Sequence, residues 1–231
     1  MPIRASFELE ANEIRLGSGP VAGVDEAGRG PWAGPVVAAA VILDPDAIPP
    51  GMADSKVLTP EEREAIYPRI LATSQVGVGI ADVERIDRDN ILNATMWAMA
   101  EAVAALVTQP RLVLIDGNRA PKLAMDSRTI VKGDARCLSI AAASIVAKVT
   151  RDRLMVELGL EHPAYGFERH KGYGTPEHQA ALARHGVTVH HRRSFKPVQL
   201  VLGLVRTYGA DALPQRLALD QPDAGFLIPA K

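Results

Sequence analysis

The sequence predicts an α/β fold, and two observations indicate it. Short apolar runs of strand length recur along the chain, and three of them end on carboxylates, at Asp25-Glu26, Asp116 and Asp134. Longer segments with apolar residues at helical spacing lie between and after these runs, most clearly in residues 91–107 and 139–158. Strands interleaved with helices in this way are typical of a sheet covered by helices.

Five segments have the pattern of strands. Val21 to Asp25 and Pro35 to Leu43 are joined by a loop rich in glycine and proline, which favours an antiparallel pair. The second of these is apolar on both faces, so we expect helices or loops to cover both of its sides. The other three segments are Gln75 to Val83, Arg111 to Asp116 and Thr129 to Lys132.

Four segments are predicted to be helices, the last of them an amphipathic helix from Pro197 to Tyr208. The first begins at Thr59, with Pro60 at the first helical position and acids in the first turn. The second covers residues 91–107, whose methionines are expected to fill the core rather than mark a cofactor site. The third covers residues 139–158 and is apolar on nearly every side in its first turns, so we expect it to be buried.

A polar stripe interrupts this third helix. Its members recur at intervals of four residues and therefore share one face. The stripe has two readings that the sequence leaves open: an internal salt bridge, or a row of side chains that points at a site. It consists of Ser144, Lys148 and Asp152.

Length and composition limit the function. A chain of 231 residues with 47% hydrophobic residues can form one sizeable domain, or one domain with a small appendage. Its formal net charge of −1 excludes a globally basic nucleic-acid binder but allows a locally basic face. Cys137 is the only cysteine, so no intrachain disulfide can form and inert packing is its expected role. With no secretory signal and no apolar run of membrane-spanning length, we expect a cytoplasmic protein that makes no membrane contact.

The chain divides into four parts by composition. Residues 1–20 read as an N-terminal arm, residues 21–160 as the core, residues 161–208 as a basic C-terminal region packed on the core, and residues 209–231 as a tail. The basic region holds all six histidines, and we expect them on a phosphate-facing or plain surface. Their spacing does not match a compact zinc site.

Asp25 and Glu26 are the most unusual pair in the sequence. Adjacent residues of a regular strand point to opposite faces, so a shared site requires the strand to end or bulge between them. Gly28 and Gly30 permit such a change because glycine adopts backbone angles closed to other residues. The alternative is a strand end followed by an ordinary polar hairpin loop.

The acids at the strand ends could form one metal site. In α/β sheets, ligands gather at the carboxyl ends of strands, which would bring Asp25, Glu26, Asp116 and Asp134 together. Carboxylates that lie so close together repel one another unless a cation lies between them. Oxygen ligands of this kind suit Mg²⁺ or Mn²⁺. Two such ions would activate a water and stabilise the leaving oxygen of a phosphodiester. A dinucleotide fingerprint and a phosphate-binding Gly-Lys-Ser/Thr loop are both missing.

Several short motifs, taken in order, resemble bacterial type 2 ribonuclease H (ribonuclease HII). The resemblance covers roughly residues 21–196, and it implies a ribonuclease H-like core: a mixed five-stranded sheet flanked by helices, with a small helical C-terminal region. Trp32, where a smaller aliphatic residue is usual, and Val57, where a second lysine is frequent, depart from the pattern. The motifs are Asp25-Glu-Ala-Gly-Arg-Gly30, Asp54-Ser-Lys56, Asp116-Gly-Asn118, Lys132-Gly-Asp134, Ala143-Ser-Ile-Val-Ala-Lys148 with Arg151-Asp152, and His170-Lys-Gly-Tyr-Gly-Thr175.

The resemblance also implies roles for individual residues. The metal-binding and catalytic acids fall on Asp25, Glu26, Asp116 and Asp134, with Mg²⁺ or Mn²⁺ as cofactor. Gly28, Arg29 and Gly30 are expected to recognise the 2′-hydroxyl and backbone where a ribonucleotide meets a deoxyribonucleotide. Lys56 is expected to contact phosphate, and Tyr173 to stack on the substrate, with Tyr165 as the alternative.

The implied activity is that of a metal-dependent endonuclease. It would hydrolyse the RNA strand of RNA/DNA hybrids and nick DNA 5′ of embedded ribonucleotides, leaving 3′-hydroxyl and 5′-phosphate ends. Its expected partners are therefore RNA/DNA hybrids and DNA that contains ribonucleotides, and we expect the protein to be a monomer. Two rivals remain: a nucleic-acid-binding module without catalysis, and another two-metal nuclease or transposase with a similar core.

Overall fold

Five strands form one mixed sheet in the computed structural model, which describes residues 5–52 and 55–204. The strand order is β3-β2-β1-β4-β5, with β2 antiparallel to both of its neighbours and β4 parallel to both of its own. This confirms the expected mixed five-stranded sheet and the expected antiparallel pair. The strands are β1 (Val21–Ala27), β2 (Val36–Leu43), β3 (Ser74–Ala81), β4 (Leu112–Asp116) and β5 (Asp126–Ile130).

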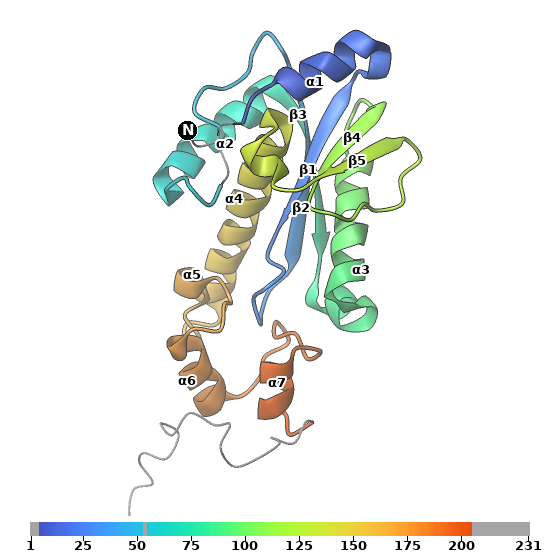
Figure 1. The fold of residues 1–231 in the computed structure, drawn as a ribbon. Coiled ribbons are helices and arrows are strands. Elements are labelled where there is room, and N and C mark those ends of the chain that lie inside the picture. Colours follow the sequence, from blue (N-terminus) through green and yellow to red (C-terminus); the bar gives the residue numbers. More distant parts are fainter. Residues whose placement is uncertain (1–4, 53–54, 205–231) are drawn as a thin grey trace, which may run out of the picture.

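Two long helices cover the sheet, α3 on one face and α4 on the other (Figure 1). α2 packs beside α4 on the same face of the sheet, the other helices lie toward the ends of the sheet, and a 3₁₀ turn at residues 133–135 leads into α4. In the described residues no helix is long and apolar enough to cross a membrane. The helices are α1 (Glu8–Glu13), α2 (Pro60–Thr73), α3 (Val83–Ala104), α4 (Leu138–Glu161), α5 (Phe167–His170), α6 (Pro176–His185) and α7 (Lys196–Val201).

The central strand β2 is buried on both faces, as its apolar sequence predicts. Ala38 and Ala40 pack in the cluster under α3, whereas Ala39 and Val41 pack in the cluster under α4. The small residues let both helices approach closely, so the sheet is held between two layers.

Glycines set the closest approach of helices to the sheet. A Cβ atom on Gly23 of β1 would lie 2.2 Å from the backbone carbon of Ser139 in α4. A Cβ atom on Gly79 of β3 would lie 2.1 Å from the backbone oxygen of Ala98 in α3. Both distances are far below van der Waals contact, so these positions accept only glycine without a shift of the backbone.

One helix begins well before the residue that the sequence predicts. The helix expected over residues 91–107 begins earlier, at Val83, because Asp82 caps its first turn through Arg85 N–H. It continues through a kink at Asn90, whose backbone is left-handed with φ 67°. The helix expected at Thr59 is confirmed, with the Thr59 hydroxyl accepting from Glu62 N–H in a capping box.

The N-terminal arm packs against the start of α4. Glu10 of α1 is fully buried, and its carboxylate accepts from the N–H and the hydroxyl of Ser139 at 2.8 and 2.7 Å. It thereby satisfies a donor at the first turn of α4 that no residue of that helix caps. The division of the chain into arm, core, basic region and tail stays a prediction, and the tail at 209–231 lies outside the described residues.

The basic region is less exposed than its composition suggests. Three of its histidines, at 170, 178 and 191, are buried, so the expectation of a surface location is wrong for them. Arg192 is also fully buried, and Arg169 forms ion pairs with Glu168 and Glu177. Aromatic contacts among Tyr165, Phe167 and the buried histidines explain the burial, because together they form a core of their own beneath α5 and α6.

Candidate active site

Three carboxylates meet at the ends of β1, β4 and the 3₁₀ turn before α4. One oxygen of each of Asp25, Asp116 and Asp134 lies within 4.8 Å of the others. Asp25 and Asp134 are buried, and Asp116 is half-buried. The prediction that the strand ends would bring these acids together is confirmed for these three residues, although 109 positions separate the first from the last.

Glu26 lies on the opposite face of β1. The strand neither ends nor bulges between the two acids, because Asp25 pairs with Ala39 and Glu26 with Ala38 in unbroken register. The predicted break in the strand is therefore wrong. Glu26 lines a cavity of about 290 Å³ under α3 together with Asp116, and it also lines the cavity of about 160 Å³ that contains Asp25. Glu26 therefore borders the acid cluster although it alternates with Asp25 along β1.

Burial and mutual repulsion disfavour the charged forms of these acids. Burial raises the pKa of Asp25 well above its usual value, and the charges of Glu26 and Asp116 raise it further. Burial also raises the pKa of Glu26 and of Asp116, although Arg29 opposes the shift at Glu26 and Gly133 N–H opposes it at Asp116. A cation between the carboxylates would remove this repulsion.

The donor set fits a hard divalent cation. All of the clustered ligand atoms are carboxylate oxygens, which Mg²⁺ and Mn²⁺ prefer, and among the residues that the structure describes no histidine or cysteine shares the cluster. The acids are held in place by the protein: Asp116 accepts from Gly133 N–H at 2.7 Å, and Asp25 accepts from Glu26 N–H at 2.7 Å. Asp25, Asp116 and Asp134 are therefore the residues that would hold a metal ion, with Glu26 beside them.

Lys56 lies over the acid cluster. Its ammonium donates to Asp134 at 3.1 Å although most of its side chain is exposed. The preceding Ser55 is buried and exchanges a hydrogen bond of 2.8 Å with Ser144, which in turn hydrogen-bonds Asp25. Arg63 donates to the carbonyls of Ser55 and Leu58 and so fixes this loop. Asp54 of the same motif lies outside the described residues.

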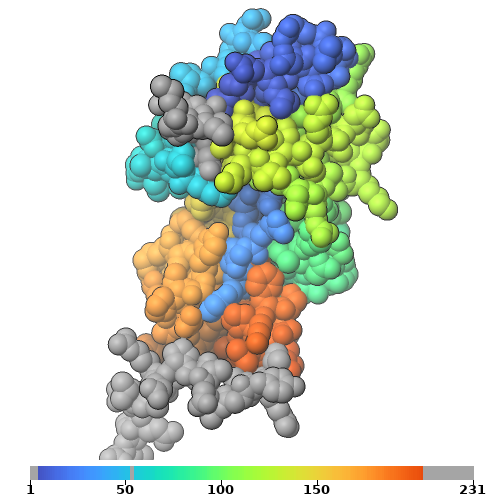
Figure 2. All heavy atoms as spheres, in the orientation of Figure 1, coloured from blue at the N-terminus to red at the C-terminus, as the bar shows by residue number. Residues whose placement is uncertain are grey.

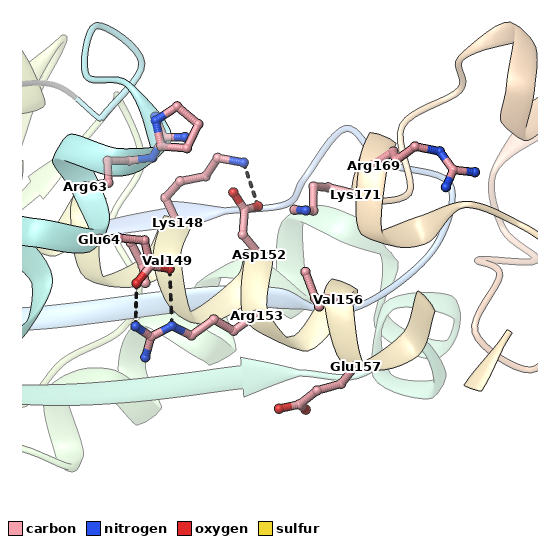
Figure 3. A pocket seen from close by; sticks show the side chains of 11 residues that line it. Arg63, Glu64, Lys148, Val149, Asp152, Arg153, Val156, Glu157, Arg169 and Lys171 are labelled. Atoms are coloured by element: carbon pink, nitrogen blue, oxygen red, sulfur yellow. Dashed lines mark hydrogen bonds and ion pairs between the residues drawn. The ribbon is translucent and has the colours of Figure 1, made fainter. Parts of the chain in front are cut away.

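The polar stripe on α4 serves both of the purposes that the sequence left open. Ser144 faces Asp25, whereas Lys148 and Asp152 form an ion pair of 2.7 Å. Figure 3 shows this pair in the wall of a cavity of about 590 Å³ between α2, α4 and α5. The cavity adjoins the acid site, because Arg63 and Lys148 also line the smaller cavity that contains Asp25. Its lining carries five cationic side chains and three carboxylates: Arg63, Lys148, Arg153, Arg169 and Lys171, with Glu64, Asp152 and Glu157.

The loop of residues 28–35, which follows the two adjacent acids, is held by one buried arginine. Arg192 is fully buried and donates to the carbonyls of the loop, at 2.6 Å to Gly28, 3.0 Å to Arg29 and 2.7 Å to Pro31. It also donates to Gly34 and Pro35. The charge has no carboxylate partner within hydrogen-bonding distance in the described residues, so its donors are saturated by backbone oxygens alone.

A second arginine closes the same loop. Arg151 of α4 donates to the carbonyls of Ala33 and Pro35 in the loop and to that of Lys171. Gly28 has a left-handed φ of 97°, and a Cβ atom there would lie 2.0 Å from Nε of Arg151. Two reasons therefore require glycine at position 28: its left-handed backbone angle, and the space that the Arg151 side chain occupies where a Cβ atom would lie.

Tyr173 lies beside this loop, and Tyr165 does not. A Cβ atom on Gly30 would lie 3.5 Å from the ring of Tyr173, which is 47% exposed. Tyr165 is buried against Phe167, and its hydroxyl donates to the carbonyl of Gly186 at 2.9 Å. Of the two tyrosines, only Tyr173 presents a ring face to a ligand at this site.

Two buried histidines hold the backbone of Tyr173. Nδ1 of His178 bonds to the Tyr173 carbonyl at 3.0 Å, and its Nε2 bonds to Nε2 of His191 at 3.0 Å. Nδ1 of His191 accepts from Thr188 N–H. Burial lowers the pKa of His178 to about 4 and that of His191 to about 3, so both rings are neutral at pH 7. The ring of Trp32 packs on His178 and leaves room only for glycine at position 174.

Sequence reasoning assigned no role to Arg192, Arg151 or His178. Figure 2 shows that parts far apart in the chain meet at the surface, because blue atoms of its early part emerge between green and orange ones. Cys137 is buried, and burial raises the pKa of its thiol to about 12, in agreement with inert packing.

Comparison with known proteins places this arrangement among named relatives. The family model of ribonuclease HII matches residues 22–198. Ribonuclease HII of Bradyrhizobium diazoefficiens is 60% identical over 197 residues, which cover 85% of this chain and 76% of that protein. Ribonuclease HII of Azorhizobium caulinodans is 60% identical over 200 residues, covering 85% of this chain and 77% of that one.

Solved structures support the same conclusion. Ribonuclease H2 from Pyrococcus horikoshii superposes with a TM-score of 0.67 at 28% identity, over 80% of this chain and 97% of that one. The ribonuclease HII of Archaeoglobus fulgidus, solved as a PCNA:RNase HII complex, superposes with a TM-score of 0.66 at 25% identity, over 84% of this chain and 100% of that one. The sheet order and helix placement are thus those of the ribonuclease H-like fold. With its acids at the strand ends of that fold and its sequence matched along most of its length, this chain belongs to the ribonuclease HII family and is an endoribonuclease of the ribonuclease H class.

Proposed function

We propose that this endoribonuclease cuts the RNA strand of RNA/DNA hybrids and nicks DNA on the 5′ side of an embedded ribonucleotide, leaving 3′-hydroxyl and 5′-phosphate ends. One observation carries the proposal: the cluster of Asp25, Asp116 and Asp134 lies at the end of the strand that leads directly into the Gly28-Arg29-Gly30 loop. A site that cleaves a phosphodiester and a loop that can read a sugar are therefore adjacent.

The acids are the residues that would hold Mg²⁺ or Mn²⁺. Asp25, Asp116 and Asp134 offer oxygens to one ion, and Glu26 approaches from the other face of β1. A divalent cation bound there supplies an activated water and charge stabilisation of the leaving oxygen. The protein contributes the positioning: Ser144 orients Asp25, and Gly133 N–H orients Asp116.

The loop and Tyr173 would read the sugars on either side of the cut. Backbone groups at Gly28 and Gly30 can approach a ribose closely, and the 2′-hydroxyl is the group that separates RNA from DNA. Arg29 is half-exposed and lies 3.2 Å from Glu26, so it connects the loop to the acids. The exposed ring of Tyr173 beside Gly30 would pack on the following deoxyribose and exclude a ribose there.

The cationic side chains beside the acids would bind the phosphates of the duplex. Lys56 lies over Asp134, where the phosphate next to the cut would stand. The adjoining cavity carries more cationic than acidic side chains, among them Lys148 and Lys171, and would accept a flanking stretch of backbone. Such contacts fix the register of a duplex without reading its sequence. We further propose that the protein acts in the cytoplasm as a monomer, with residues 21–160 as the catalytic core and residues 161–208 completing the substrate site.

A single assay tests this function. The full chain is incubated with Mg²⁺ or Mn²⁺ and with end-labelled duplexes that carry zero, one or many ribonucleotides, and the cuts are mapped. We expect no cut in pure DNA, one cut 5′ of the single ribonucleotide, and many cuts in the continuous hybrid. Cleavage of pure DNA at a similar rate would instead indicate a two-metal nuclease without ribonucleotide preference. Binding without any cleavage would indicate a nucleic-acid-binding module.

A further inference from the structure

Glu161, His162 and His190 converge where α4 ends, away from the acid cluster. One ligand atom of each lies within 4.8 Å of the others. Glu161 is the last residue of α4, His162 follows it directly, and His190 belongs to the loop between α6 and α7. The two imidazole rings lie 5.1 Å apart between centroids at an interplanar angle of 61°. A carboxylate and two imidazoles are the ligands of many three-residue zinc sites.

The ring nitrogens of this pair differ from those of the buried histidines. In His170, His178 and His191 both ring nitrogens form hydrogen bonds to protein groups. Within residues 5–52 and 55–204, by contrast, no protein group hydrogen-bonds the ring nitrogens of His162 or His190. Their lone pairs are therefore available to a ligand.

We propose that Glu161, His162 and His190 form a second metal site, selective for Zn²⁺ or a similar transition-metal ion and separate from the acid cluster. Zinc bonds of about 2.0 to 2.2 Å in tetrahedral geometry place ligand atoms about 3.4 Å apart, so the three side chains need only rotate toward one another. Glu161 is exposed and both histidines are half-buried, which leaves them room for that rotation. The fourth position would hold water.

The site would connect α4 to the loop of residues 28–35. The backbone carbonyl of His190 accepts from Gly34 N–H at 2.9 Å, and His191 forms an isolated β-bridge with Ala33. A metal ion at His190 would therefore fix the segment that supports this loop to the end of α4. Binding of a metal ion here does not depend on the proposed function, because the three ligands form a group separate from the acid cluster.

Histidine-resolved NMR tests the site directly. The full chain is saturated with Mg²⁺ to occupy the acid cluster and titrated with Zn²⁺, while the imidazole resonances of its six histidines are followed. We expect the resonances of His162 and His190 to shift together and to saturate at one equivalent, with His185 unchanged. If Zn²⁺ leaves the resonances of both His162 and His190 unchanged, the proposal is overturned.

Matched variants separate the site from nonspecific binding. His162→Ala, His190→Ala and Glu161→Gln should each lower Zn²⁺ affinity at least about tenfold, since even the loss of a supporting contact commonly costs that much. His185→Ala and Glu61→Gln, exposed residues away from the cluster, should keep the affinity of the parent protein. The resonances of the buried histidines report whether each variant is folded. Equal affinity in the ligand variants and the controls would contradict the assignment.

Discussion

The guanidinium of Arg192 donates to the carbonyl of Gly28 at 2.6 Å, although 163 residues of chain lie between them. This contact joins the basic C-terminal region to the loop that follows the two adjacent acids. The same side chain also holds Arg29, Pro31, Gly34 and Pro35, so a residue from the far end of the described chain fixes most of the loop.

Replacement of Arg192 should impair both stability and cleavage. Arg192→Ala leaves several buried carbonyls without donors, so we expect the free energy of unfolding to fall by about 3 kcal/mol or more. Arg192→Lys keeps the charge, but an ammonium cannot reach the carbonyls that the planar guanidinium spans. The folded lysine variant should therefore lose cleavage on the order of a hundredfold through misplacement of the loop. Urea unfolding and cleavage rates measure the two effects, with the exposed neighbour Arg193→Ala as control; parent-like cleavage in Arg192→Lys would contradict the positioning role.

Asp25→Asn should abolish cleavage and stabilise the metal-free protein. The pKa of Asp25 is raised, so its protonated form contributes stability below the usual value near 3.8, and this contribution is lost as pH rises through the raised pKa. At pH 7 to 8 the neutral amide removes the repulsion between the Asp25 carboxylate and the neighbouring acids. We therefore expect the free energy of unfolding, measured by thermal unfolding in EDTA, to rise by about 1 kcal/mol. Asp134→Asn should also abolish cleavage with folding intact, whereas Asp126→Asn on the exposed edge strand should change little. Near-normal turnover in either site variant would refute the acid cluster as the active site.

Tyr173→Ala should discriminate between substrates. If the ring packs on the deoxyribose after the junction, its loss removes up to about 3 kcal/mol of buried apolar contact and lowers cleavage of single-ribonucleotide DNA more than cleavage of a continuous hybrid. Tyr165→Phe removes the hydrogen bond to Gly186 and should lower stability without changing the ratio of the two rates. Steady-state kinetics on both duplexes supplies the comparison, and equal losses for Tyr173→Ala would argue against junction reading.

Acid should destabilise the protein through its buried histidine pair. The pKa of His178 is lowered to about 4 and that of His191 to about 3, so the unfolded chain binds protons more readily. Stability from the neutral rings is present above pH 6.5 and is lost as pH falls toward these values, by up to about 3 kcal/mol for each ring at pH 4. Urea unfolding between pH 7 and pH 4 should show a smaller loss for His178→Asn than for the parent. The exposed His185→Asn should follow the parent; a parallel decline in His178→Asn would exclude the pair as the source.

The acids of the site could be predicted from the sequence, but the face that each one occupies could not. Asp25 and Asp116 follow apolar strands directly, and that pattern places them at a sheet edge. The pleat of β1 continues through Glu26 because its partner strand β2 is long enough to pair with it, which only the register reveals.

The burial of Arg192 and His178 could not be predicted from the sequence, for a different reason. An arginine or histidine in a basic segment is expected at the surface, and burial requires partners that are remote in sequence. Arg192 finds them in the carbonyls of the 28–35 loop, and His178 finds them in Tyr173 and His191. The sequence could not decide between Tyr165 and Tyr173 as the stacking residue, because the packing of Tyr165 on Phe167 is visible only in the structure.

Anomalous diffraction from crystals of the full chain grown with Mn²⁺ and an uncleaved hybrid tests the central claim most directly. We predict manganese between the carboxylates of Asp25, Asp116 and Asp134, and a second ion about 4 Å away that Glu26 reaches. Manganese bound elsewhere, with this carboxylate cluster empty at saturating Mn²⁺, would contradict the account.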